Sequence, residues 1–148
     1  MDRILVALAL AAVVVVIAVV LQRRRPDAPT QPTGGFTAPA QLDRADFARS
    51  DAPWLVVVFT SATCDTCADV AAKAAILESP EVAVQVVEAV EDRDLHQRYG
   101  VEAVPIVAIA GSDGAVRSSF LGPVSSTHLW AALAELRDPG SVPPDCSH

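Results

Sequence analysis

Hydrophobic positions divide the chain into an apolar segment at the amino terminus and a mixed region after it. Ile4 to Leu21 is an unbroken apolar run of 18 residues, and Arg23–Arg25 follow it closely. As a helix this run is about 27 Å long, close to the hydrocarbon thickness of a bilayer. The pattern predicts a single N-terminal transmembrane helix, with residues 1–25 as an anchor and its basic flank. A cleaved signal peptide is the alternative, and it predicts a shorter apolar core followed by a small-residue cleavage site.

Charge and proline content set the next boundaries. One arginine precedes the apolar run and three follow it, so the positive-inside tendency places the rest of the chain in the cytoplasm. Residues 26–41 contain four prolines and a Gly-Gly pair without hydrophobic periodicity, which is typical of a linker. Residues 139–148 are again rich in proline and are expected to form a flexible C-terminal tail. Residues 42–138 remain as the one folded domain.

Within residues 42–138 the hydrophobic pattern is that of an α/β domain. Continuous β-branched and aromatic runs predict buried strands, and alanine- and leucine-rich stretches at helical spacing predict helices. The expected elements are a helix over 42–49 capped by Asp43, a strand over 54–60, a helix over 68–77 capped by Ser61 or Thr63, a strand over 82–89, a helix over 93–99, strands over 106–110 and 116–121, and a helix over 126–137. This order predicts a mixed β-sheet flanked by helices.

The charge balance narrows the class of partner. The chain has a net charge of −7, and residues 26–148 hold 17 of its 18 acidic side chains but only seven of its 11 basic ones. General nucleic-acid binders need a basic face, so the composition argues against that class. The sequence also lacks a Gly-rich phosphate loop and a Ser–His–Asp arrangement, so its chemistry has to be sought elsewhere.

Two cysteines lie three residues apart between a predicted strand and a predicted helix. Cys64 and Cys67 enclose Asp-Thr, follow the strand 54–60 and open the helix 68–77. At a helix start, unpaired backbone N–H groups and the helix dipole favour an anion, so Cys64 is expected to be a nucleophilic thiolate. Cys67 can then attack the mixed disulfide that Cys64 forms. The placement favours a redox-active dithiol.

Three other interpretations of the cysteine pair stay open. The pair can be half of a zinc site, with Cys146 and His148 completing four ligands. The two cysteines can be buried and inert, or they can form a permanent structural disulfide, although so small a loop stabilises little. Cys146 itself is either a free thiol in the tail or an auxiliary thiol with a regulatory or resolving role.

A second motif lies before the strand 106–110. Tyr99 and Gly100 are followed, after four residues, by Pro105. The strand–CxxC–helix order together with this Tyr-Gly-x-x-x-x-Pro stretch resembles the thioredoxin-fold family from about residue 42 to residue 137. With the apolar amino terminus, the whole chain is similar to bacterial membrane-anchored thiol–disulfide oxidoreductases. The resemblance implies a thioredoxin-like mixed β-sheet flanked by helices and a single-pass location in a bacterial cell membrane.

The resemblance also implies roles for individual residues. It implies that Pro105 has a cis peptide bond, faces the disulfide and shapes a groove in which the neighbouring backbone pairs with an extended substrate. Gly122 matches a glycine that lets the substrate approach. The implied catalytic residues are Cys64 and Cys67, and the implied substrate-binding residues are Pro105, Val104, Asp65 and Thr66.

The sequence departs from the family at three positions. The buried acid that thioredoxins carry six residues before the first cysteine is Val58 here, the usual tryptophan before that cysteine is Thr63, and Ala72 stands near the place of the helix proline. The usual aid to deprotonating Cys67 is therefore missing. Glu88, on the next predicted strand, is a candidate proton acceptor in its place.

The expected function is a membrane-anchored thiol–disulfide oxidoreductase that exchanges disulfides with protein thiols and takes electrons from an unidentified dithiol donor. Neither an organic cofactor nor a metal is expected. Asp65 places a negative charge beside Cys64, and a like charge raises the pKa of a thiol. A less stable thiolate favours a reductant over an oxidant, and a Cys64 pKa well below ~5 would contradict this expectation.

Two other function classes compete with this one. A redox-inactive thioredoxin-fold binding module or metallochaperone would bind its partner or metal without turnover of disulfides. An antioxidant peroxidase of the same fold usually has a lone reactive cysteine with Thr or Pro a few residues before it, so the paired cysteines argue against that class.

Overall fold

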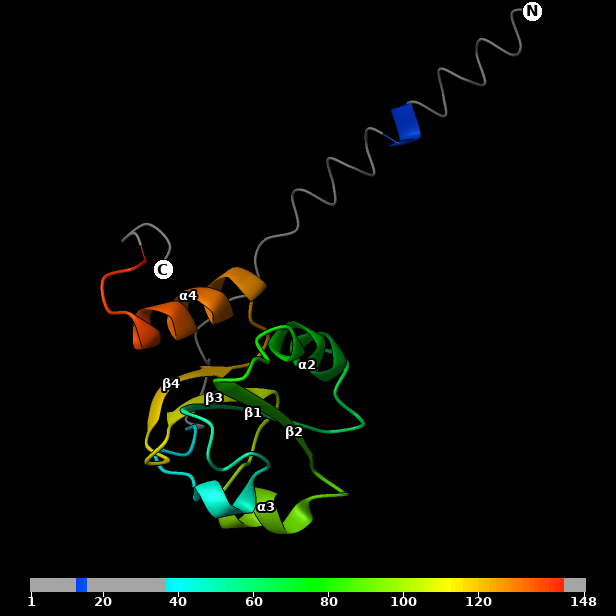
Figure 1. Cartoon of the computed structure of the whole chain (residues 1–148). Coiled ribbons are helices and arrows are strands. Elements are labelled where there is room, and N and C mark those ends of the chain that lie inside the picture. The colour runs from blue at the N-terminus through cyan, green and yellow to red at the C-terminus, as the bar shows by residue number, and fades with distance from the viewer. Residues whose placement is uncertain (1–12, 16–36, 143–148) are drawn as a thin grey trace, which may run out of the picture.

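The computed structural model describes residues 13–15 and 37–142 (Figure 1). Its elements are η1, a 3-10 helix (Arg44–Asp46), β1 (Trp54–Thr60), α2 (Cys67–Ala75), β2 (Val82–Glu88), α3 (Arg93–Arg98), β3 (Ile106–Gly111), β4 (Val116–Leu121) and α4 (Ser126–Arg137). The described residues 13–15 are helical. All four predicted strands are confirmed, as are the helices α2, α3 and α4, with boundaries that differ by no more than two residues.

The four strands form one mixed sheet in the order β2-β1-β3-β4. β1 pairs with β2 in parallel, whereas β3 is antiparallel to both β1 and β4. Figure 1 shows α2 and α4 over one face of this sheet, with α3 and η1 over the other. The predicted mixed sheet flanked by helices is therefore confirmed.

The core consists of two hydrophobic clusters, one on each face of the sheet. Successive side chains of β1 alternate between them, because neighbouring residues of a strand point to opposite faces. Val57 and Phe59 belong to the cluster with Leu42 and Phe47, and Val56 belongs to the cluster with residues of α2 and α4. A central strand covered on both faces needs apolar residues at every position, which explains the continuous run over 54–60.

The predicted helix over 42–49 is wrong, because only η1 forms there. Leu42 and Phe47 are buried against the sheet, and the Leu42 N–H donates to the carbonyl of Gly114 at 2.9 Å. Arg49 has a φ of 52°, outside the right-handed helical region. These tertiary contacts hold the segment in a more extended path. The predicted cap is confirmed, since the Asp43 carboxylate accepts from the N–H of Ala45 at 3.0 Å.

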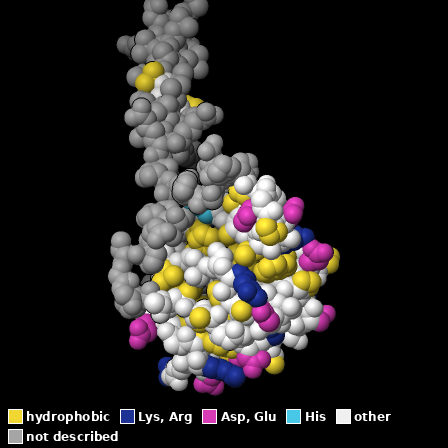
Figure 2. All heavy atoms as spheres, turned by 90° about the vertical axis from the view of Figure 1, so that its left-hand side faces the viewer, with side chains coloured by type: hydrophobic (Ala, Val, Ile, Leu, Met, Phe, Trp, Pro, Cys, Tyr) yellow, Lys and Arg dark blue, Asp and Glu magenta, His cyan; other side chains and the backbone are white. Residues whose placement is uncertain are grey.

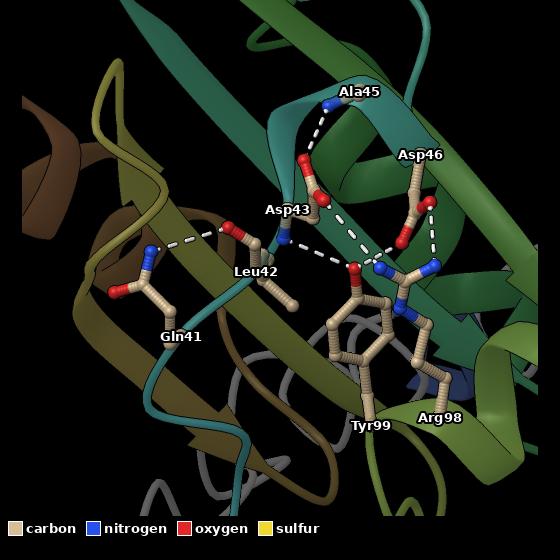
Figure 3. Close-up of polar contacts among 7 residues, drawn as sticks. All are labelled: Gln41, Leu42, Asp43, Ala45, Asp46, Arg98 and Tyr99. Carbon is tan, nitrogen blue, oxygen red and sulfur yellow. Dashed lines mark hydrogen bonds and ion pairs between the residues drawn. The ribbon is translucent and has the colours of Figure 1, made fainter.

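A polar cluster fastens this segment to the end of α3 (Figure 3). The Tyr99 hydroxyl accepts from the N–H of Asp43 at 3.0 Å and donates to the carboxylate of Asp46. Arg98 pairs with Asp46 at 3.1 Å and with Asp43 at 3.4 Å. Burial and the bond to Asp46 raise the pKa of Tyr99. The cluster fixes the start of the stretch that leads from Tyr99 to Pro105.

Several basic side chains on the domain surface form ion pairs with acidic ones. On the face shown in Figure 2, Lys and Arg side chains lie beside acidic ones. Arg117 pairs with Asp113 at 2.6 Å, and Arg137 pairs with Glu81. This distribution differs from the continuous basic face of a nucleic-acid binder.

The expected membrane location requires a correction. Among residues 13–15 and 37–142, no helix combines the length and the apolar character needed to cross a bilayer. The predicted single-pass location in a bacterial cell membrane, with a cytoplasmic domain, is contradicted by this finding. Most of the predicted anchor (1–25) and of the predicted linker (26–41) lies outside the described residues.

Candidate functional site

Cys64 and Cys67 form a disulfide at the junction of β1 and α2. Their sulfurs are 2.13 Å apart and their Cα atoms 5.4 Å apart. β1 ends at Thr60 and α2 begins at Cys67. The end of the central strand thus delivers the pair to the amino terminus of a helix, as the spacing in the sequence predicts.

The two cysteines differ in their exposure to solvent. Cys67 is only 3% exposed, whereas Cys64 is partly exposed. The N–H of Cys67 donates to the carbonyl of Cys64 at 3.3 Å, and the Thr66 hydroxyl lies 3.8 Å from the sulfur of Cys64. A partner thiol or disulfide can therefore reach Cys64, while Cys67 lies behind it.

The turn before Cys64 is held by its own polar groups. The N–H of Cys64 donates to the carbonyl of Ser61 at 3.1 Å, and the hydroxyls of Ser61 and Thr63 lie 3.1 Å apart. The prediction that Ser61 or Thr63 caps the helix is therefore wrong, because their hydroxyls bond to each other within the turn. Thr66 takes the cap position of α2 without a side-chain hydrogen bond.

The second predicted motif contributes a cis peptide bond. The bond between Val104 and Pro105 is cis, so the expected cis peptide bond is confirmed, while the role of Pro105 in a substrate groove stays a prediction. The N–H of Gly122 donates to the carbonyl of Pro105 at 2.8 Å and links the end of β4 to this loop. Gly122 has a φ of +83°, and a Cβ there would meet no atom within 4 Å. Backbone conformation, rather than lack of space, therefore favours glycine at this position.

Lys73 connects α2 to the segment between β4 and α4. Its ammonium donates to the carbonyl of Val124 at 3.1 Å and pairs with Asp69 at 2.7 Å. The pair with Asp69 is expected from their i,i+4 spacing. The contact with Val124 bridges 51 residues, and no local sequence signal predicts it. It fixes the orientation of the helix that carries Cys67.

The Glu88 carboxylate is bound by backbone N–H groups from two segments. It accepts from Ala62 at 2.9 Å, from Val90 at 2.7 Å and from Glu91 at 3.0 Å. The bonds from Glu91, Val90 and Ala62 lower the pKa of Glu88. These partners differ from the thiol expected of a proton acceptor, and that role for Glu88 stays a prediction.

His96 is a second residue whose environment the sequence did not reveal. Sequence spacing places it on a helix, and the structure buries it to 7% exposure. Its Nε2 lies 3.1 Å from the carbonyl of Val87, and its ring packs edge-on against Phe59 with centroids 5.4 Å apart. His96 thus supports the end of β2, directly before Glu88.

The described residues offer no cluster for a metal. Within residues 13–15 and 37–142, no group of three or more His, Cys, Asp or Glu side chains gathers at one point. Cys146 and His148, which the zinc interpretation requires, lie outside the described residues. The predicted role of Cys146 as an auxiliary thiol also remains a prediction.

Solved structures similar to this chain include thioredoxins. Oxidised thioredoxin O2 from Arabidopsis thaliana is 25% identical, with 63% of this chain and 88% of that chain covered and a TM-score of 0.50. A mutant thioredoxin from Halobacterium salinarum is 20% identical, with 74% and 100% covered and a TM-score of 0.52. The germline thioredoxin Deadhead from Drosophila melanogaster is 21% identical, with 59% and 84% covered and a TM-score of 0.51. No family model and no curated protein matches the sequence.

The chain has a thioredoxin-like fold. The fold and the Cys64–Cys67 disulfide at the β1–α2 junction together support a thioredoxin-like disulfide oxidoreductase.

Proposed function

We propose that this chain is a thiol–disulfide oxidoreductase that exchanges disulfides with protein thiols through Cys64 and Cys67. The single observation that carries the proposal is the unequal access to one disulfide, since Cys64 is partly exposed and Cys67 is 3% exposed. An exposed sulfur can attack or be attacked by a partner, whereas a buried neighbour is suited to an internal second step. The proposed electron donor is another dithiol, and no organic cofactor takes part.

The proposed reaction has two exchange steps. In the reduced protein the Cys64 thiolate attacks one sulfur of a substrate disulfide, forms a mixed disulfide and releases the other substrate sulfur as a thiolate. The Cys67 thiolate then attacks Cys64, closes the internal disulfide and releases the second substrate sulfur. Two electrons pass from the protein dithiol to the substrate, and the two thiol protons end on the substrate thiols.

We propose that Pro105 and Val104, with Asp65 and Thr66, contact the substrate. Asp65 and Thr66 are exposed between the two cysteines, where an approaching substrate would meet them. The carbonyl of Pro105 already accepts from Gly122, so the Pro105 loop and the end of β4 are held together as one wall of the proposed groove.

We also propose that the protein acts as a reductant rather than an oxidant. Asp65 adds a carboxylate directly beside Cys64, and a nearby negative charge disfavours a second one on the thiolate. A destabilised thiolate makes the reduced form a better electron donor.

A turnover assay tests the proposed function. The full-length chain, with dithiothreitol as donor and insulin as a disulfide-containing protein, is expected to reduce insulin catalytically, well above the rate with dithiothreitol alone. The absence of turnover, with tight stoichiometric binding of zinc, would contradict the proposal and favour a binding module or metallochaperone. Rapid consumption of hydrogen peroxide without insulin reduction would favour a peroxidase instead.

A further inference from the structure

The carboxylate of Glu88 bridges two backbone segments, one at Ala62 and one at residues 90–91. One oxygen accepts from the N–H of Ala62 at 2.9 Å, and the other accepts from Val90 and Glu91 at 2.7 and 3.0 Å. The backbone of Glu88 is itself fixed, because its N–H donates to the Asp92 carboxylate at 3.0 Å and its carbonyl accepts from the N–H of Asp92 at 2.8 Å. The side chain therefore starts from a well-anchored position at the end of β2.

The contact with Ala62 lies just beyond the last hydrogen bond between β1 and β2. The N–H of Ala89 donates to the carbonyl of Thr60 at 3.0 Å at the end of the β1–β2 pairing. Ala62 lies two residues beyond Thr60 and two residues before Cys64. The Glu88 side chain therefore adds one more hydrogen bond between the end of β2 and the turn that follows β1, beyond the backbone pairing of the two strands. This bond joins residues 26 positions apart in the sequence.

We propose that Glu88 is a positioning residue that holds the turn of residues 61–63 against the end of β2 and thereby fixes Cys64 for disulfide exchange. The inference rests on the proposed function and deepens it. The turn leads directly into Cys64, whose N–H donates to the carbonyl of Ser61 at 3.1 Å. Releasing Ala62 would leave the turn with only its internal hydrogen bonds, detach it from the end of β2 and lower the effective concentration of Cys64 at Cys67.

The same contacts make Glu88 a poor proton acceptor. Three N–H donors occupy its oxygens and stabilise the ionised form, and its pKa is accordingly lowered. A carboxyl group with a lowered pKa gives up a proton readily and holds one weakly. The hydrogen bonds of Glu88 are thus those of a backbone anchor.

Amide hydrogen exchange of Ala62 tests the contact directly. In the oxidised full-length chain, we expect the Ala62 amide to exchange about tenfold or more faster in Glu88→Ala than in the natural protein, because a charge-assisted hydrogen bond is lost. Glu88→Gln keeps one acceptor oxygen and is expected to give an intermediate rate. Glu91→Gln removes a neighbouring charge without touching the Ala62 contact, so it serves as the matched control with an unchanged rate.

The pH dependence of this exchange provides a second signature. A lowered folded-state pKa means that the stabilisation from ionised Glu88 is present above the unfolded-state pKa and is lost as pH falls through the folded-state pKa. After correction for intrinsic exchange, protection of Ala62 should therefore persist below about pH 4.3, the ordinary value for glutamate. Glu88→Gln should show no such titration.

Redox equilibrium then separates positioning from proton transfer. We expect the equilibrium constant for closing the Cys64–Cys67 disulfide with glutathione to fall about tenfold in Glu88→Ala, equivalent to about 30 mV, with a smaller change in Glu88→Gln. The pH profile of the exchange rate should keep its shape in both variants. Equal rate losses in both variants with a displaced pH profile would instead establish Glu88 as a proton acceptor and overturn the proposal.

Unchanged exchange of Ala62 in Glu88→Ala would also overturn it, whatever the turnover. If Ala62 responds as expected but the natural protein turns over no disulfide, the contact stands and the proposed function fails, and the positioning role fails with it. The two failures are therefore distinguishable.

Discussion

The Cys64→Ser variant is expected to lose disulfide turnover by roughly a thousandfold or more, the scale on which enzymes respond to removal of a nucleophile. Cys64 is the accessible partner of the disulfide, and its neighbour Cys67 is 3% exposed. A serine hydroxyl does not form a mixed disulfide, so the first exchange step cannot begin. Insulin reduction with dithiothreitol measures the loss.

Cys67→Ser should fail at the second step instead. Cys64 still attacks the substrate, but the internal thiolate that would release it is gone, so a covalent mixed disulfide accumulates. Non-reducing electrophoresis should show this adduct with Cys67→Ser and not with Cys64→Ser. Cys146→Ser is the matched control, and it leaves the CxxC pair intact. An adduct that forms through Cys67 in Cys64→Ser would reverse the assigned roles.

Val58→Asp is expected to destabilise the domain by about 3 kcal/mol or more at neutral pH, because it buries a carboxylate in an apolar cluster. Val58 is 0% exposed and packs in the cluster that includes Val56, Val70 and Val107. Burial would raise the pKa of the new carboxyl group above its unfolded-state value. The variant should therefore be relatively most stable in acid and lose stability as pH rises through the folded-state pKa. Urea unfolding at several pH values measures both effects.

Val58→Asn is the matched control for the charge. Asparagine has nearly the same shape as aspartate and is also polar, but it does not titrate. The loss of stability in Val58→Asn should therefore not depend on pH in the way expected for Val58→Asp. Val58→Asp with the stability of the natural protein at neutral pH would mean that this position is not the dry, apolar site described above. Position 58, where thioredoxins carry a buried acid, would then accommodate a carboxylate in this chain as well.

The sheet and its main helices follow from local patterns, whereas the segment over 42–49 does not. The run over 54–59 is apolar at every position because β1 is central and covered on both faces. A helix is predicted over 42–49, but the burial of Leu42 and Phe47 against the sheet and the bond from Asp43 to Tyr99 determine the path of that segment. Those contacts join residues far apart in sequence, so propensity alone could not predict them.

The same distinction applies to the site. The cysteine pair and Pro105 are recognisable because their chemistry depends on residue type and spacing, and the structure places the pair at the start of α2 with a cis bond at Pro105. Ala62, one partner of Glu88, lies 26 residues away from it, and Val124, one partner of Lys73, lies 51 residues away. An acidic residue at the end of a strand can be expected from the sequence to bind N–H groups of the following turn. That Ala62 is also its partner can be seen only in the folded structure.

The reduction potential of the Cys64–Cys67 pair tests the central claim most directly. The full-length chain would be equilibrated in graded thiol buffers, quenched and alkylated to count free thiols. We expect one two-electron transition near about −270 mV, the value for thioredoxin, which is that of a protein that donates electrons to substrate disulfides. A transition near about −120 mV would identify an oxidant and contradict the effect assigned to Asp65. The absence of any two-electron transition would contradict the assignment of this chain as a thiol–disulfide oxidoreductase.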